Sequence, residues 1–178
     1  MQALSFYLTE KKCLPFDIPH LVIPNLFRNL FLCYNILMNT NLKDYKSLIS
    51  SAIKMLDFSY VPYSHFHVGA ALLTTQGKIY TGCNIENAAY GPSNCAERTA
   101  FFKAVSEGEH NFSAIAIVGG PEDENGNPVI KDFCPPCGVC RQVMAEFCKK
   151  DFEIILAKSP EEYKVFTLGE LLPESFSL

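Results

Sequence analysis

The sequence contains Asn94-Cys95-Ala96-Glu97-Arg98 and Pro135-Pro136-Cys137-Gly138-Val139-Cys140, which together supply three clustered thiols and one carboxylate. Catalytic zinc sites commonly use three protein ligands and leave one position for water, whereas structural sites fill all four positions with protein. Three thiolates beside an acid that is not a ligand form the arrangement needed to activate water on zinc. The two stretches therefore predict a zinc site with one open position.

Each stretch is also predicted to begin a helix. Cys95 opens a helix over 94–106, and Cys137 and Cys140 open another over 138–149. Helix N-termini carry partial positive charge and free N–H groups, and both lower thiol pKa values. The spacing therefore suits metal ligation for a physical reason as well as by pattern.

Two arginines and one glutamate accompany the thiols. Three thiolates leave a net negative charge on the zinc centre, and Arg98, three residues after Cys95, can donate hydrogen bonds that reduce it. Arg141 is a second candidate for that task. Glu97 is expected over the open position, where it can take a proton from water and pass it to a substrate nitrogen.

Other interpretations of the same cysteines remain open at this point. Cys137 and Cys140 alone have the spacing of a thioredoxin-like redox pair, and Cys134 and Cys137 form an overlapping pair. A structural zinc site with Cys134 as the fourth ligand leaves Glu97 without a role. His65 and His67, which share one face of a predicted strand, are further possible ligands, but three thiols are already placed.

The bulk composition limits the class of protein. With 178 residues, 48% apolar and 19% charged, the chain is long enough for one globular domain with a core. The net charge of −4 argues against nucleic acid, since polyanion binders usually carry basic patches. No unbroken apolar run of roughly 20 residues predicts a membrane span. A small, weakly charged ligand fits this balance better.

The eight cysteines favour a reducing compartment. Disulfides would be expected in a secreted chain, but no clear secretory signal is present and the cysteines cluster at metal-type spacing. We therefore expect a cytoplasmic protein. Residues 1–37, rich in Phe and Leu and interrupted by prolines, are expected to be a poorly packed extension or an over-long gene start, with the working domain over 38–178.

The remaining pattern predicts an α/β fold. From Leu42 onward apolar residues recur at helical spacing until a stop before Pro62. Strands are expected over 66–73, 78–84, 112–118, 152–157 and 163–166, with a helical turn over 168–171 and an exposed loop over 119–132. Alternating strands and helices predict three layers, α/β/α, around a central mixed sheet of about five strands.

At these residues the chain resembles the small homotetrameric cytidine deaminases of the three-cysteine type, and the resemblance covers about 38–176. Zinc deaminases share a Cys-rich zinc site and a non-ligand Glu that acts as general acid and base. The matching runs are Tyr63-Ser64-His65-Phe66-His67-Val68-Gly69-Ala70-Ala71, Gly82-Cys83-Asn84-Ile85-Glu86-Asn87-Ala88, Cys95-Ala96-Glu97-Arg98-Thr99-Ala100 and Pro136-Cys137-Gly138-Val139-Cys140-Arg141-Gln142.

The resemblance implies a role for each matching position. The zinc ligands would be Cys95, Cys137 and Cys140, with Glu97 as the catalytic acid and base. Substrate contacts are implied for Phe66 against the pyrimidine, Asn84 and Glu86 on the ribose 3′-hydroxyl, and the Ala96 backbone on the base edge. Tyr90 and Phe176 would complete a neighbouring subunit's site in a homotetramer. From the residues alone, Asn84 and Glu86 also fit a solvated strand end, and Phe66 fits ordinary core.

The implied reaction is hydrolytic deamination of cytidine or 2′-deoxycytidine to the uridine product and ammonia. One alternative is a related deaminase that acts on an aminoacylnucleoside antibiotic, and another is a non-catalytic zinc or thiol module. Two features depart from the family pattern: the loop over 121–133 is longer than usual, and residues 1–37 have no counterpart.

Overall fold

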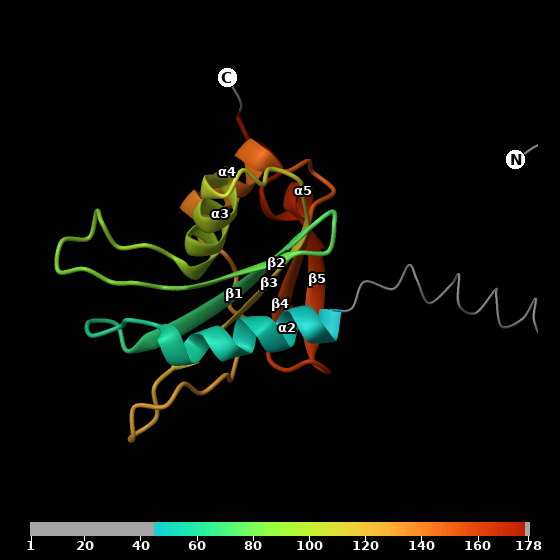
Figure 1. Ribbon diagram of the computed structural model, residues 1–178. Helices are drawn as coiled ribbons and strands as arrows, with labels where there is room; N and C mark the ends of the chain where they lie inside the picture. The colour runs from blue at the N-terminus through green and yellow to red at the C-terminus, as the bar shows by residue number, and fades with distance from the viewer. Residues whose placement is uncertain (1–44, 177–178) are drawn as a thin grey trace, which may run out of the picture. The chain divides into compact units, whose positions relative to one another are not determined.

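The computed structural model describes residues 45–176 (Figure 1). The predicted extension over 1–37, the boundary at Met38 and the start of the first predicted helix lie outside these residues. Within the described part, every helix is too short or too polar to cross a bilayer.

A five-stranded mixed sheet forms the centre of the structure, in the order β2-β1-β3-β4-β5. Its strands are β1 (Phe66–Thr74), β2 (Ile79–Cys83), β3 (Phe112–Pro121), β4 (Glu153–Ala157) and β5 (Tyr163–Thr167). β3 and β4 run parallel, whereas every other neighbouring pair is antiparallel. The predicted mixed sheet of about five strands is therefore confirmed.

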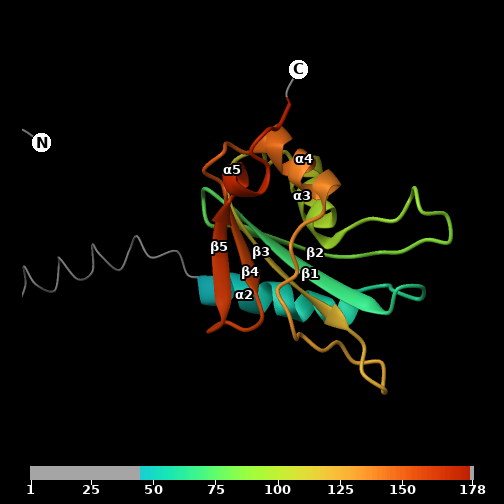
Figure 2. The ribbon, with the colours of Figure 1, turned by 180° about the vertical axis from the view of Figure 1, so that it is seen from behind.

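Helices cover both faces of the sheet, as Figures 1 and 2 show from opposite sides. One face carries α2 (Tyr45–Ile53), which continues into the 3-10 turn η2 (Lys54–Phe58). The other carries α3 (Ala96–Ser106), α4 (Gly138–Phe147) and the short α5 (Leu168–Leu171). The three-layer α/β/α architecture is therefore confirmed.

Strand β3 explains why the sheet needs helices on both faces. Ala114, Ala116 and Val118 belong to the core cluster under α2, whereas Ile115 and Ile117 belong to the cluster under α3 and α4. A strand buried on both faces has a continuous apolar run, unlike a half-exposed strand, in which apolar and polar residues alternate. The Ala-rich side lets α2 approach closely, and the Ile-rich side fills the space below α3 and α4.

Several element ends differ from the sequence expectation by one to three residues, and two of them have a clear physical reason. β3 continues to Pro121 and not 118, because Phe66 at the start of β1 still pairs with Pro121. α4 ends at Phe147 and not 149, because Cys148 is already extended. The longer β3 matters for the site, because its pairing with β1 extends beyond Gly119 and Gly120. The strand therefore reaches the loop that precedes Cys134.

Gly82 allows α3 to lie directly against the sheet. A Cβ atom at this position would lie 2.3 Å from the Ala96 carbonyl oxygen and 2.6 Å from the Ala100 nitrogen. Both neighbours are helix backbone, so they cannot move aside without moving α3. The close approach therefore fixes the height of the α3 N-terminus above β2.

We predict that Gly82→Ala lowers the free energy of unfolding by about 1–3 kcal/mol, because the added methyl group forces α3 away from β2. Urea unfolding of the full chain measures this. Gly91→Ala is the matched control, since a Cβ at Gly91 meets nothing within 4 Å. Equal stability of the two variants would contradict the packing argument.

Candidate active site

The predicted thiol cluster forms where the first turns of α3 and α4 meet. The Sγ atoms of Cys95, Cys137 and Cys140 all lie within 4.8 Å of one another. The Cys95–Cys137 and Cys137–Cys140 Sγ distances are 3.9 and 3.5 Å. Cys95 and Cys137 are the N-cap residues of α3 and α4, and the Cys140 backbone N–H donates to Cys137 Sγ. Two helix N-termini thus converge on the thiols.

The electrostatics of the cluster favour the thiolate form of Cys95 first. The hydrogen bond from the Cys140 thiol lowers the pKa of Cys95 to about 5, and Arg98 acts in the same direction. Arg98 Nη2 lies 3.6 Å from Cys95 Sγ and also donates to the Ser93 carbonyl oxygen at 3.2 Å. Conversely, that same hydrogen bond, together with burial, raises the pKa of Cys140, which keeps its proton in the absence of a cation.

The donor set fits one zinc ion. Three thiolates this close repel one another, and a soft divalent cation removes that penalty for all three at once. Cys134 is not a member of the cluster, and burial raises the pKa of its thiol to about 12. Arg141 does not reach the thiols either, because it donates to the carbonyl oxygens of Pro136 and Leu171, both at 2.8 Å.

Glu97 lies in the first turn of α3 and is only 4% exposed. Burial raises the pKa of its carboxyl group to about 7, and the neighbouring Cys95 contributes in the same direction. A carboxyl group with a pKa near neutral can both take and give a proton under physiological conditions. The side chain therefore has the electrostatic character of a general acid and base.

A cavity of about 370 Å³ opens beside the thiols. It is lined by Cys95, Cys137, Glu97, Arg98, Asn84, Glu86 and Tyr90, together with Val68, Ser93, Asn94, Cys134 and Pro135. Some lining residues were not assigned a role from the sequence. Among them, Asn94 has a sequence signal, because it directly precedes Cys95. Val68, Ser93 and Pro135 carried no chemical signal of their own.

Asn84 and Glu86 reach this cavity because the segment that follows β2 pairs with the segment before α3. The Ile85 N–H donates to the Asn94 carbonyl oxygen, and the Asn94 N–H donates to that of Ile85, both at 2.9 Å. This reciprocal pair places Asn84 and Glu86 next to Cys95 in space. Residues at the end of one hairpin and at the start of a later helix thus line one cavity.

Asn84 and Glu86 also support the backbone around β1. Asn84 accepts from the Val68 N–H and donates to the Phe66 carbonyl oxygen, both at 2.8 Å. Glu86 accepts from the Tyr63 and Ser64 N–H groups at 3.1 and 3.2 Å. Burial alone would raise the pKa of Glu86, but these bonds and the Ser64 hydroxyl lower it below its usual value. Glu86 is therefore a carboxylate, and only its Oε2 atom accepts from these two N–H groups.

The remaining predicted residues are distributed around this cavity. Phe66 is 37% exposed and lines a smaller adjoining cavity of about 110 Å³, which shares Cys134 with the larger one. Ala96 is fully buried at the start of α3. Tyr90 is 93% exposed and lies in the loop between β2 and α3.

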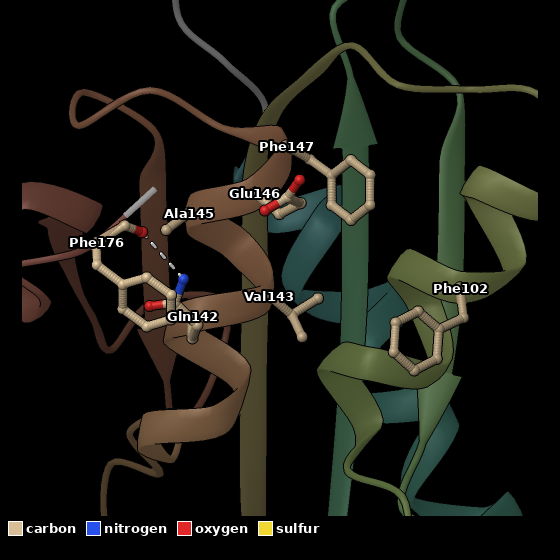
Figure 3. A pocket seen from close by; sticks show the side chains of 7 residues that line it. All are labelled: Phe102, Gln142, Val143, Ala145, Glu146, Phe147 and Phe176. Atoms are coloured by element: carbon tan, nitrogen blue, oxygen red, sulfur yellow. Dashed lines mark hydrogen bonds between the residues drawn. The ribbon is translucent and has the colours of Figure 1, made fainter. Parts of the chain in front are cut away.

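Phe176 lies elsewhere, in a cavity of about 670 Å³ that is larger but carries no thiol (Figure 3). Phe102 of α3, Val143 and Phe147 of α4, and Phe176 supply its apolar surface, and the Phe176 carbonyl oxygen accepts from Gln142 Nε2 at 3.3 Å. Glu146 is its one acidic lining residue. The structure thus brings Tyr90 to the thiol cavity of its own chain and leaves Phe176 out of it.

We predict that Cys137→Ser abolishes stoichiometric zinc binding and lowers the melting temperature by several degrees, because a ligand bound only by the folded state stabilises it. Metal analysis and thermal unfolding of purified protein measure both effects. Cys134→Ser is the matched control and keeps about one zinc per chain if three thiols suffice. Loss of zinc in that control would instead support a four-cysteine site.

Comparisons with known proteins agree with this geometry. A family model described as the cytidine and deoxycytidylate deaminase zinc-binding region matches residues 42–156. Cytidine deaminase of Sporosarcina psychrophila is 49% identical over 134 residues, covering 75% of this chain and 92% of that protein. The crystal structure of cytidine deaminase from Burkholderia pseudomallei is 45% identical with a TM-score of 0.63, covering 73% of this chain and 97% of that one.

A more distant relative has a different substrate in its name. Blasticidin-S deaminase of Bacillus cereus is 29% identical over 130 residues, covering 73% of this chain and 90% of that protein. The family match spans well over half of the chain and includes all three thiols of the cluster, which confirms the resemblance inferred from the motifs. This chain belongs to the cytidine and deoxycytidylate deaminase family and contains its zinc-binding region.

Proposed function

We propose that the protein catalyses the hydrolytic deamination of cytidine and 2′-deoxycytidine, in which water replaces the 4-amino group and ammonia leaves. The observation that carries the proposal is one cavity that holds the thiols Cys95 and Cys137, the buried acid Glu97, and the polar pair Asn84 and Glu86. The cavity volume of about 370 Å³ suits a nucleoside. The similarity to cytidine deaminases adds support.

In this proposal Cys95, Cys137 and Cys140 hold one zinc ion, which supplies a nucleophilic water at neutral pH when bound. Arg98 offsets the negative charge of the thiolates through its contact with Cys95. The free N–H groups in the first turn of α3, starting at Ala96, donate to the base and fix its edge. These groups are held by the helix, so they need no rearrangement as charge develops.

Glu97 moves the protons of the reaction. Its carboxylate accepts a proton from the attacking water and delivers it to N3 of the ring as C4 becomes tetrahedral. It then carries the proton of the new C4 hydroxyl to the departing amine, which leaves as ammonia while the C4 carbonyl forms. Its pKa of about 7 suits both directions of transfer. Burial of the side chain limits proton exchange with bulk water during these steps.

The sugar would be bound by Asn84 and Glu86. The Glu86 oxygen that is not used by the Tyr63 and Ser64 N–H groups can accept from a ribose 3′-hydroxyl. A carboxylate at this place also repels a phosphate, which favours a nucleoside over a nucleotide. Phe66 would pack against the pyrimidine beside the adjoining cavity.

We predict that Glu97→Gln reduces kcat by at least 10²- to 10⁴-fold while zinc remains bound, because an amide cannot relay a proton. Loss of cytidine absorbance and metal content are measured in parallel on both proteins. An active, zinc-loaded Glu97→Gln protein would refute this role. Zinc-loaded wild type without turnover of cytidine or deoxycytidine would instead favour a non-catalytic module or another substrate.

An aminoacylnucleoside antibiotic is the alternative substrate, and the similarity to blasticidin-S deaminase is the observation that favours it. The higher identity to cytidine deaminases favours the nucleoside. The rates of deamination of blasticidin S and of cytidine, measured in the same assay, show which of the two is the substrate.

We also propose that the protein is a homotetramer with composite sites and is located in the cytoplasm. Phe102, Val139 and Phe176 are exposed large apolar side chains on or beside α3 and α4, as expected of a surface that another copy covers. The free thiols of the described part suit a reducing compartment. A domain boundary near Met38 is supported by a family match that starts at residue 42.

We predict that Phe176→Ala and Glu97→Gln complement each other. If Phe176 completes the site of a neighbouring subunit, some sites of a mixed tetramer contain both wild-type residues, so co-assembled chains are much more active than either variant alone. Native mass determination verifies mixing. Mixed tetramers that show only the average of the two separate activities would exclude a contribution across the interface.

A further inference from the structure

Glu122 connects two histidines on the strand that carries Phe66. It follows β3 directly, and its Oε2 and Oε1 atoms accept from His65 Nδ1 at 2.9 Å and His67 Nε2 at 3.0 Å. The remaining ring nitrogen of His67, Nδ1, lies 3.0 Å from the Leu56 carbonyl oxygen, so polar contacts hold the ring on both sides. Hydrogen bonds from His67 and His65 hold the pKa of the Glu122 carboxyl group below its usual range.

His65 has a backbone conformation that needs support. Its φ of 54° makes it the one positive-φ residue other than glycine in the described part of the chain. Such a conformation costs free energy and persists only where the surroundings fix it. Glu122 supplies two of the contacts: its backbone N–H donates to the His65 carbonyl oxygen at 2.9 Å, and its carboxylate binds the ring. A third is the His65 N–H, which donates to Val61 at 3.1 Å.

Phe66 lies between the two histidines that Glu122 holds. Its backbone N–H donates to the Ser64 hydroxyl at 3.2 Å, and its carbonyl oxygen accepts from Asn84 at 2.8 Å. Phe66 is 37% exposed and lines the small cavity, so neighbouring side chains leave part of its surface uncovered. The direction of the ring therefore depends on the backbone of residues 65–67, which Glu122 fixes from both ends.

A second carboxylate holds the preceding residues of the same turn. Glu86 binds the Tyr63 and Ser64 N–H groups and lines the thiol cavity, whereas Glu122 does not line it. The turn over 63–67 is thus held by one carboxylate inside the cavity and one outside it. Glu122 therefore has no direct contact with a ligand in that cavity, whereas the residues that it holds adjoin it.

We propose that Glu122 is a positioning residue of the deaminase site, which holds the strained turn at His65 and thereby the ring of Phe66 in the orientation that packs on the pyrimidine. This inference rests on the proposed function, because Phe66 is a substrate contact only if the ligand is a pyrimidine nucleoside. It also gives a role to the start of the long loop over 121–133, whose first side chain beyond β3 is Glu122.

The kinetic test uses full-length, zinc-loaded Glu122→Ala and Glu122→Gln, with Glu124→Ala as the matched control. Glu124 is an exposed carboxylate in the same loop, so its removal changes charge equally. We expect Glu122→Ala to raise KM for cytidine roughly tenfold with kcat nearly unchanged, because base–aromatic stacking is a binding term. Glu122→Gln keeps one of the two hydrogen bonds to the histidines, so we expect its KM to lie between those of wild type and Glu122→Ala. Unchanged KM in both Glu122 variants overturns the proposal.

A double-mutant cycle tests whether Glu122 acts through Phe66. In a Phe66→Ala background, Glu122→Ala is expected to leave KM unchanged, since the ring to be positioned is already gone. Full additivity of the two effects on KM would show that Glu122 acts by another route and overturns the assignment. Thermal unfolding of each variant shows whether it is destabilised. If Glu122→Ala is, the cycle is repeated with Glu122→Gln, which keeps the shape of the side chain.

Amide hydrogen exchange separates this inference from the proposed function. Peptides that span 61–67 are expected to exchange faster in Glu122→Ala than in wild type, and at the wild-type rate in Glu124→Ala. Wild type that fails to deaminate cytidine would refute the proposed function, and with it the role of Phe66. Unaltered exchange in Glu122→Ala, with wild type active, would refute only the positioning role.

Discussion

Three thiols within 4.8 Å of one another are stable as thiolates only around a cation, and this requirement shapes the surrounding structure. The thiols reach one point because α3 and α4 both begin there, on the same face of the sheet. Gly82 lets the first turn of α3 approach β2, and β3 supplies the apolar surface below both helices. Zinc binding and core packing therefore depend on the same helix positions.

The residues around the cavity combine structural and chemical contacts. Asn84 and Glu86 bind backbone groups of the 63–68 segment and still present polar atoms to the cavity. A side chain already held by two hydrogen bonds loses little entropy when it binds a ligand, so the site is preorganised. A substitution at Asn84 therefore removes a hydrogen bond to the Phe66 backbone as well as a polar group of the cavity.

Burial divides the ionisable groups of the cavity into two kinds. Glu97 is nearly fully buried, and its pKa rises to about 7, whereas hydrogen bonds from N–H groups keep Glu86 ionised. Two carboxyl groups in one cavity thus have opposite character, which is the separation needed for one to move protons and the other to bind a hydroxyl. Arg98, which also lines the cavity, offsets part of the thiolate charge through its contact with Cys95.

Much of the fold could be predicted because its signals are local. The apolar runs of β1 and β3 and the helical spacing of Leu48, Ile49 and Ala52 indicate the element type within a few residues. The ends of elements were less predictable: β3 extends to Pro121 because Phe66 pairs with it across the sheet, and such pairing has no local signal. Arg141 illustrates the same limit, since its contact with Leu171 depends on where α5 packs.

The sequence by itself determined the chemistry of the centre, since three thiols at helix starts with one acid two residues beyond Cys95 are properties of residue type and spacing. Only the tertiary structure decided which cysteines meet, that Cys134 stays outside the cluster, and that Glu122 joins His65 to His67. The reason is physical. Spacing along the chain sets which residues share a helix face, whereas contacts between β1, the 121–133 loop and the helix N-termini arise only once the sheet brings distant segments together.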